Sequence, residues 1–124
     1  FNGDIATWQT GKVEDMSNIF ANSGFNNTLL LWDTSSVKIF TSAFEKATAF
    51  NQSLTTWDTK AANAFYVSPL GGSYVFDFMF NGASQFNQDL KSWCVSNVPS
   101  EPSFFSRGSQ LSAGNKPLWG VACA

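Results

Sequence analysis

The sequence predicts an α/β repeat solenoid of about four units, each built from one short extended segment and one short helix. Two observations lead to this prediction. An eight-residue pattern, F-N-x-x-[IL]-x-x-W, occurs four times along the chain. Each of the first three copies is followed by a stretch with the apolar spacing of a helix. One extended piece and one helix in about 25 residues are typical of α/β solenoids, whose units bury their faces on their neighbours.

The repeated pattern divides the 124-residue chain into four units of one domain. The copies begin at Phe1, Phe25, Phe50 and Phe86 and end at Trp8, Trp32, Trp57 and Trp93. We therefore expect units at residues 1–24, 25–49, 50–85 and 86–124, with an insertion at residues 62–72 and a C-terminal cap in the last unit.

Within each unit the two halves differ in period. In residues 13–20 and 37–44, apolar side chains recur at positions i, i+3, i+6 and i+7, which is the spacing of one helical face. Residues 75–83 continue this pattern in the third unit. The F-N-x-x-L-x-x-W stretch has no helical period, so we expect extended chain there, with a short strand near its end. Helices this short need tertiary packing to be stable.

The repeated apolar columns are expected to stack into a continuous aromatic core. The predicted core consists of Phe1, Trp8, Phe20, Phe25, Trp32, Phe44, Phe50, Trp57, Phe80, Phe86, Trp93 and Phe105. The Asn that follows the first Phe of each copy is expected to form a ladder that satisfies backbone groups. The alternative for the rings is an exposed platform that stacks on carbohydrate.

Composition excludes several functions. The chain has no histidine, which rules out Ser-His and Cys-His nucleophile pairs and His-ligated zinc. A formal net charge of −2 argues against nucleic-acid binding. The longest apolar run, residues 29–32, is far shorter than the ~20 residues of a membrane span. We therefore expect no cofactor, no metal, no nucleic-acid partner and no direct membrane insertion.

The two cysteines, Cys94 and Cys123, belong to no metal-binding motif. We predict a disulfide that closes the C-terminal segment, which the chain-entropy model values at about 3–4 kcal/mol. Such a bond would imply an oxidising, extracellular compartment. The alternative is a pair of buried free thiols. Pro99 and Pro102 interrupt the last unit, and the segment that leads to Trp119 has the character of a terminal cap.

The motif F-N-x-[DS]-L-x-x-W-D-[TV]-x-x-V…F-x-x-A resembles the repeats of the DUF285, BspA-like surface proteins, which are related to the leucine-rich-repeat class. The segment from residue 93 through residue 120 is similar to the C-terminal end of such arrays. The resemblance covers essentially the whole chain. It implies a non-enzymatic module at the cell surface, used for adhesion or for interaction with protein or glycan. This chain departs from the pattern in its insertion and in residues 27–31, where polar spacers become apolar.

Two pairs of polar residues are candidate sites. Asn26 and Asn51 head N-x-[ST] sequons and could carry glycans, unless a buried ladder blocks them. Asp33 and Asp58 follow the tryptophan in adjacent units. Stacked carboxylates could bind Ca²⁺, but they could equally be solvated charges or helix-start acceptors. Two carboxylates are also the minimum for glycoside hydrolysis, although no motif indicates a cleft.

The insertion is the candidate interaction loop, because loops on a rigid scaffold often carry recognition. Its apolar and aromatic residues are Phe65, Tyr66, Val67, Leu70 and Tyr74. The alternative is a loop folded onto its own unit. Phe1 stands at the first repeat column without a cap, so a longer array or another copy would cover it. The alternative function is therefore a structural subunit that assembles end to end into an extracellular fibre.

Overall fold

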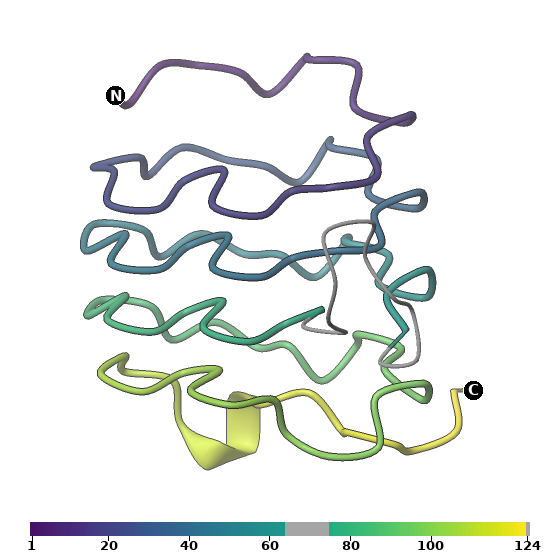
Figure 1. The fold of residues 1–124 in the computed structure, drawn as a ribbon. Coiled ribbons are helices and arrows are strands. Elements are labelled where there is room, and N and C mark those ends of the chain that lie inside the picture. Colours follow the sequence, from purple (N-terminus) through teal and green to yellow (C-terminus); the bar gives the residue numbers. More distant parts are fainter. Residues whose placement is uncertain (64–74, 124) are drawn as a thin grey trace.

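The computed structural model describes residues 1–63 and 75–123. The chain winds into coils that lie on one another in sequence order, with the N-terminus at one end of the stack and the C-terminal segment at the other (Figure 1). Backbone hydrogen bonds join successive coils in register. The Met16 amide donates to the Ile39 carbonyl at 2.9 Å, and one coil later the Phe40 amide donates to the Val75 carbonyl at 2.7 Å.

The predicted α/β architecture is wrong. Among the described residues, the only helix is η1, a three-residue 3-10 helix at Ala113–Asn115. The only β pairing in these ranges is an isolated parallel bridge between Asp15 and Ile39. Where the structure describes them, the coils therefore contain neither the predicted helices nor the predicted strands, and the fold is not a leucine-rich-repeat-like α/β solenoid.

The segments predicted to be helical are ribbons of overlapping turns. In the second coil, the Glu45 amide donates to the Ser42 carbonyl three residues earlier, at 3.1 Å. The neighbouring Phe44 amide donates instead to the Met79 carbonyl of the third coil, at 2.8 Å. Alternate residues thus bond within and between coils. An α-helix would direct all of these amides to carbonyls four residues earlier in the same coil.

Left-handed backbone positions make this ribbon possible, because a type II turn needs a positive φ at its third residue. Residues with positive φ recur in pairs along the coils, at Asn18 and Asn22, Ser42 and Lys46, Phe78 and Gly82, and Phe104 and Gly108. The ribbon buries Phe40, Ala43, Phe44 and Ala47. This i, i+3, i+4, i+7 spacing is also that of a helical face. The apolar spacing therefore predicted which side chains are buried, but it did not predict the conformation of the backbone.

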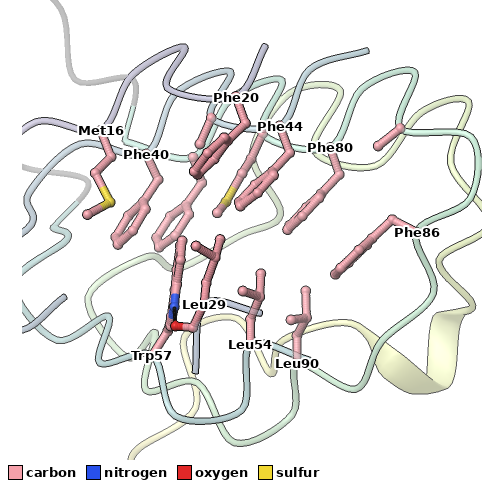
Figure 2. Packing of buried hydrophobic residues seen from close by; sticks show 14 of the residues in the cluster. Met16, Phe20, Leu29, Phe40, Phe44, Leu54, Trp57, Phe80, Phe86 and Leu90 are labelled. Carbon is pink, nitrogen blue, oxygen red and sulfur yellow. Dashed lines mark hydrogen bonds between the residues drawn. The ribbon is translucent and has the colours of Figure 1, made fainter. Parts of the chain in front are cut away.

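Phenylalanine rings from successive coils stack through the centre of the molecule (Figure 2). The Phe44 ring lies between those of Phe20 and Phe80, at centroid distances of 5.4 and 5.3 Å, and is nearly parallel to both. A second column, formed by Phe25, Phe50 and Phe86, stacks in the same way. Figure 2 shows Leu29, Leu54 and Leu90 as a separate row opposite the rings.

Two of the predicted core residues are not buried. Phe1 is 74% exposed and Trp8 is 59% exposed. Among the described residues, each ring stacks on one equivalent, Phe1 on Phe25 at 6.3 Å and Trp8 on Trp32 at 6.4 Å. Their other faces are therefore uncovered in this structure. The remaining predicted core residues are buried.

Candidate functional site

One edge of the stack is formed by the turns that end at tryptophan. The buried Trp32 indole donates from Nε1 to the Ile5 carbonyl of the preceding coil at 2.9 Å. Trp57 and Trp93 repeat this bond one and two coils later. The two residues before each tryptophan lie at the surface. In the second coil they are Leu30 and Leu31, and Leu31 is 73% exposed.

A ladder of asparagines runs along the stack, as predicted. The Asn26 amide donates to Oδ1 of Asn2 at 2.7 Å, and the Asn51 amide donates to Oδ1 of Asn26 at 2.9 Å. Asn87 and Ser112 continue the ladder in the same direction. Each asparagine uses its side-chain oxygen, and within the described residues Nδ2 of Asn26 and of Asn51 has no hydrogen-bond partner. The ladder therefore leaves unused the nitrogen that a glycan would take.

A second ladder joins buried threonines to the backbone of the next coil. The Thr10 hydroxyl donates to the Asp33 carbonyl at 3.1 Å and accepts the Asp33 amide at 3.0 Å. Thr34 forms the same pair of bonds with Asp58. Because each hydroxyl is both donor and acceptor, one side chain satisfies two backbone groups that a sheet would otherwise pair.

The carboxylates of Asp33 and Asp58 each serve a local turn. Oδ1 of Asp33 accepts the Ser35 hydroxyl at 2.6 Å and the Ser35 amide at 2.9 Å, and Oδ1 of Asp58 accepts the Lys60 amide at 2.9 Å. The Ser35 hydroxyl bond, followed by the backbone bond, holds the pKa of Asp33 below its ordinary value. In residues 1–63 and 75–123, no group of three His, Cys, Asp or Glu side chains could hold a metal ion.

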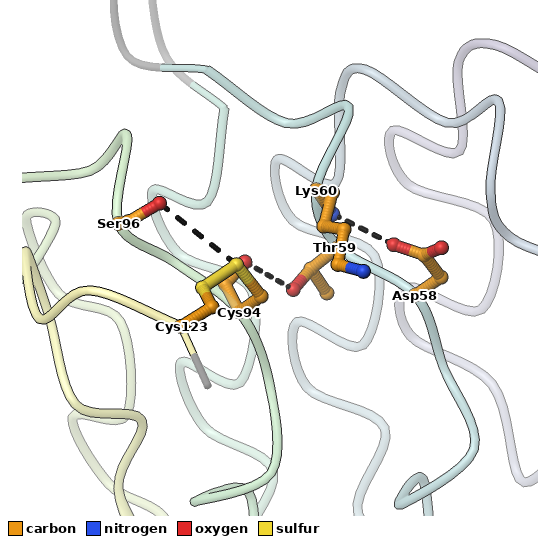
Figure 3. Close-up of a disulfide and its surroundings, with 6 residues drawn as sticks. All are labelled: Asp58, Thr59, Lys60, Cys94, Ser96 and Cys123. Atoms are coloured by element: carbon orange, nitrogen blue, oxygen red, sulfur yellow. Dashed lines mark hydrogen bonds between the residues drawn. A yellow bond between two sulfur atoms is a disulfide. The ribbon is translucent and has the colours of Figure 1, made fainter.

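The predicted disulfide between Cys94 and Cys123 is present and ties the C-terminal segment to the fourth coil (Figure 3). The Cα atoms of the two cysteines are 5.5 Å apart. The Cys94 carbonyl also accepts the Thr59 hydroxyl at 2.9 Å, which anchors this coil to the third. In the same C-terminal segment, Trp119 packs edge-on against Phe105, with centroids 4.9 Å apart. We call residues 111–123 the cap.

An aromatic pair of one half-buried and one exposed ring, which sequence reasoning missed, lies on the third and fourth coils. We call it the Phe78/Phe104 patch. The rings of Phe78 and Phe104 are 5.1 Å apart and tilted by 33°. Phe104 is 47% exposed, and the Arg107 guanidinium lies 5.2 Å from its ring centroid. Both phenylalanines have positive φ, at the position that Asn18 and Ser42 occupy in the first two coils.

A hollow of about 350 Å³ adjoins this patch. Phe104, Ser106, Arg107, Glu101 and Lys116 are among the residues that line it. Lys116 Nζ forms an ion pair with the Glu101 carboxylate at 2.8 Å. The signal that could have found the patch was a comparison of repeat positions, because large aromatic residues replace the small polar ones of the earlier coils.

A second hollow, of about 430 Å³, lies beside the disulfide and is lined in part by Lys60, Lys91, Leu118 and Val121. The lining of this hollow therefore combines cationic and aliphatic side chains. Lys91 Nζ also lies 4.0 Å from the Asp89 carboxylate.

Two further carboxylates have shifted pKa values. The hydrogen bond and charge of Lys38, 2.9 Å away, lower the pKa of the exposed Glu14. Burial raises the pKa of Asp77, which is half-buried in the third coil. Neither Glu14 nor Asp77 lines the hollow beside the Phe78/Phe104 patch.

The predicted interaction residues Phe65, Tyr66, Val67, Leu70 and Tyr74 lie outside the described residues. The described chain enters the insertion at Ala62, which is buried and whose amide donates to the Thr59 carbonyl at 3.1 Å. The role of the insertion as an interaction loop stays a prediction.

A family model described as "Mycoplasma protein of unknown function, DUF285" matches residues 1–68 and 72–122. No curated protein and no solved structure matches the chain. Among the described residues, no helix is long and apolar enough to cross a membrane.

Proposed function

We propose that this chain, which belongs to the DUF285 family, is a non-enzymatic module that acts outside the cell or at its surface by binding a protein or a glycan. Two features support a surface location. The repeat pattern resembles that of BspA-like surface proteins, and the disulfide between Cys94 and Cys123 suits an oxidising compartment.

The observation that carries this proposal is the contrast between inward and outward repeat positions. Inward positions keep their chemistry from coil to coil, as Phe20, Phe44 and Phe80 do. Outward positions change, and the second coil exposes Leu31 where the third coil has Thr56. A rigid scaffold with varied surface residues suits recognition, because ordered surface groups lose little entropy on binding.

Binding of the purified chain to cells and to extracellular matrix tests the proposal. We expect saturable binding, and we expect the double variant Leu30→Thr/Leu31→Thr to weaken it, because the change restores the threonine pair of the third coil. Ile19→Thr is the matched control, since it removes an exposed aliphatic side chain elsewhere. If the unaltered chain binds neither cells nor extracellular matrix, the proposal is wrong.

A structural subunit that assembles end to end is the second candidate. The parallel stacking of rings between coils, as between Phe44 and Phe80, favours it, because a second copy can continue the same contact. At the opposite end, Trp119 covers Phe105, so a head-to-tail contact would have to form on the cap. Electron microscopy at high protein concentration separates the two candidates: fibres support assembly, and isolated particles exclude it.

A further inference from the structure

We propose that the Phe78/Phe104 patch and the adjoining hollow bind a carboxylated sugar residue. The exposed part of the Phe104 ring packs against the sugar and Arg107 binds the carboxylate. This inference rests on the proposed function as a surface-binding module, since it names the ligand class and the site.

The first argument is the backbone at the two phenylalanines. Phe78 has φ 61° and Phe104 has φ 53°, a region that bulky side chains rarely adopt. Asparagine, which tolerates this region better, stands at the equivalent position of the first coil as Asn18. A positive φ occurs at this position in every coil, so the conformation belongs to the ribbon, and only the third and fourth coils place a large ring there. The sequence therefore places rings here against a local backbone preference.

The second argument is the exposure of Phe104 beside a buried neighbour. Phe105 fills the core and is almost completely buried, so the coil is already closed by the adjacent residue. Phe104 instead turns nearly half of its surface to solvent and touches Phe78 on the outside of the stack. Aromatic rings of this kind supply rigid, flat contact area to a ligand at little entropic cost.

The third argument is the orientation of Arg107. Its guanidinium lies over the Phe104 ring, and cation–π attraction holds it there. In the described part of the chain, no carboxylate forms an ion pair with it. The neighbouring Lys116 is already paired with Glu101. Arg107 is thus the cation of this hollow that can offer a bidentate fork to an incoming carboxylate.

The lining of the hollow favours a sugar over an acidic peptide. Its volume of about 350 Å³ lies within the usual ~300–1,000 Å³ of ligand pockets. Ser106, Glu101 and Lys116 offer hydrogen-bond donors and acceptors to ring hydroxyls. The Glu101 carboxylate also disfavours ligands that carry several negative charges close together.

Calorimetric titration with a trisaccharide that contains one uronic acid residue and two neutral sugars tests the proposal. We expect binding by the unaltered chain, and a loss of about tenfold or more in Arg107→Gln, since a charge-assisted bidentate contact is removed. Lys12→Gln is the control, because it removes the same charge from a distant surface and should bind as well as the unaltered chain. The methyl ester of the trisaccharide should bind at least about tenfold more weakly than the free acid.

A second variant separates recognition from folding. Phe104→Asn removes the ring but accepts the positive φ, so we expect it to lose trisaccharide binding without a fall in melting temperature. A marked fall in the melting temperature of Phe104→Asn, with binding retained in Arg107→Gln, would show that the patch is structural and would overturn the proposal.

The outcomes also distinguish this inference from the proposed function. Binding to cells or matrix without binding to the trisaccharide, or trisaccharide binding that Arg107→Gln leaves unchanged, overturns the sugar site alone. Equal affinity for a glutamate-rich peptide overturns the choice of sugar over peptide. Failure to bind cells and matrix overturns the proposed function, whatever the trisaccharide does.

Discussion

The middle of the stack and the cap hold their aromatic rings in different ways. Between the second and third coils, Phe44 and Phe80 are nearly parallel, with an interplanar angle of 5°. From Phe80 to Phe105 the angle is 81°, and from Phe105 to Trp119 it is 84°. In parallel stacking, the same ring-to-ring contact repeats between each coil and the next. Edge-on packing presents no equivalent face for a further coil, so the geometry changes where the stack closes.

The polar contacts change in parallel with the rings. The middle coils share asparagine, threonine and tryptophan bonds that repeat at equivalent positions. The cap is joined to the asparagine ladder by one bond, from the Ser112 amide to Oδ1 of Asn87, and the disulfide at Cys123 holds it further along the chain. The difference indicates that the repeats spread their stability over many similar contacts, whereas the cap concentrates it in a few.

The largest expected effect comes from Phe44→Ala in the middle of the stack. The ring is fully buried and stacks on Phe20, Phe50 and Phe80. Removing it leaves a cavity, which for Phe→Ala changes in cores costs about 3–5 kcal/mol of unfolding free energy. Denaturant unfolding measures this loss. The exposed change Leu31→Ala is the control and should stay within about 0.5 kcal/mol. A loss below about 1 kcal/mol in Phe44→Ala would contradict a shared core.

Removing the disulfide should act mainly on the cap. Cys94→Ser/Cys123→Ser is expected to lower the free energy of unfolding by about 3–4 kcal/mol, because the unfolded chain regains the entropy of an open loop. Amide exchange should accelerate at Gly120 well before Phe44. Reducing agent should reproduce the effect in the unaltered chain and leave the double variant unchanged. Equal acceleration at both amides would contradict an independent cap.

A smaller effect is expected from breaking one rung of the asparagine ladder. Oδ1 of Asn51 accepts the Asn87 amide and the Gln88 side-chain amide, both at 3.0 Å. Since these groups are partly exposed and water can replace the acceptor, Asn51→Ala should cost about 1 kcal/mol. Thermal unfolding tests this. Asn51→Asp, which keeps the acceptor oxygen, should retain most of the stability, and a similar loss in both variants would refute the ladder's role.

The smallest expected effect is a pH dependence at Asp77. Burial raises its folded pKa above the ordinary value of 3.8, so the folded state holds the proton more tightly than the unfolded state. Ionisation therefore destabilises the fold as pH rises through the folded pKa. We expect Asp77→Asn to melt slightly higher than the unaltered chain at pH 7. The gain should disappear below pH 3.8, where Asp77 is protonated in both states.

Asp33, in the second coil, should give a pH dependence of stability opposite in sign to that of Asp77. Its pKa is lowered by Ser35, so its contribution is present above 3.8 and is lost as pH falls through the folded pKa. Asp33→Ala should therefore lower the melting temperature at pH 7 and converge with the unaltered chain in acid. The same direction of pH dependence for the Asp33 and Asp77 variants would contradict the assigned environments.

The repeat register could be predicted from sequence because the F-N and Trp residues recur at equivalent positions of successive coils. The asparagine oxygen and the indole Nε1 both bond to neighbouring coils. The backbone could not be predicted, since a ribbon of turns buries the same spacing of residues as a helix. Lys46, with φ 56°, gives no sequence signal of the kind that glycine gives for a left-handed turn.

The candidate site was predictable only in part. Cys94 and Cys123 were the only cysteines, so their pairing needed no geometry. The Phe78/Phe104 patch was hidden because Phe104 precedes Phe105, and a repeat alignment assigns only one of two adjacent phenylalanines to the core. The alignment places Phe105 in the core, but neither the left-handed backbone at Phe104 nor the contact of its ring with Phe78 can be predicted from the sequence.

The central structural claim is that hydrogen bonds between turn ribbons, not helices, join the coils. NMR scalar couplings across hydrogen bonds test it most directly, because they identify the donor and the acceptor of each bond. The structure predicts a coupling between the Phe44 amide nitrogen and the Met79 carbonyl carbon. A coupling from the Phe44 amide to the Phe40 carbonyl, four residues earlier in the same coil, would instead show a helix and contradict the account.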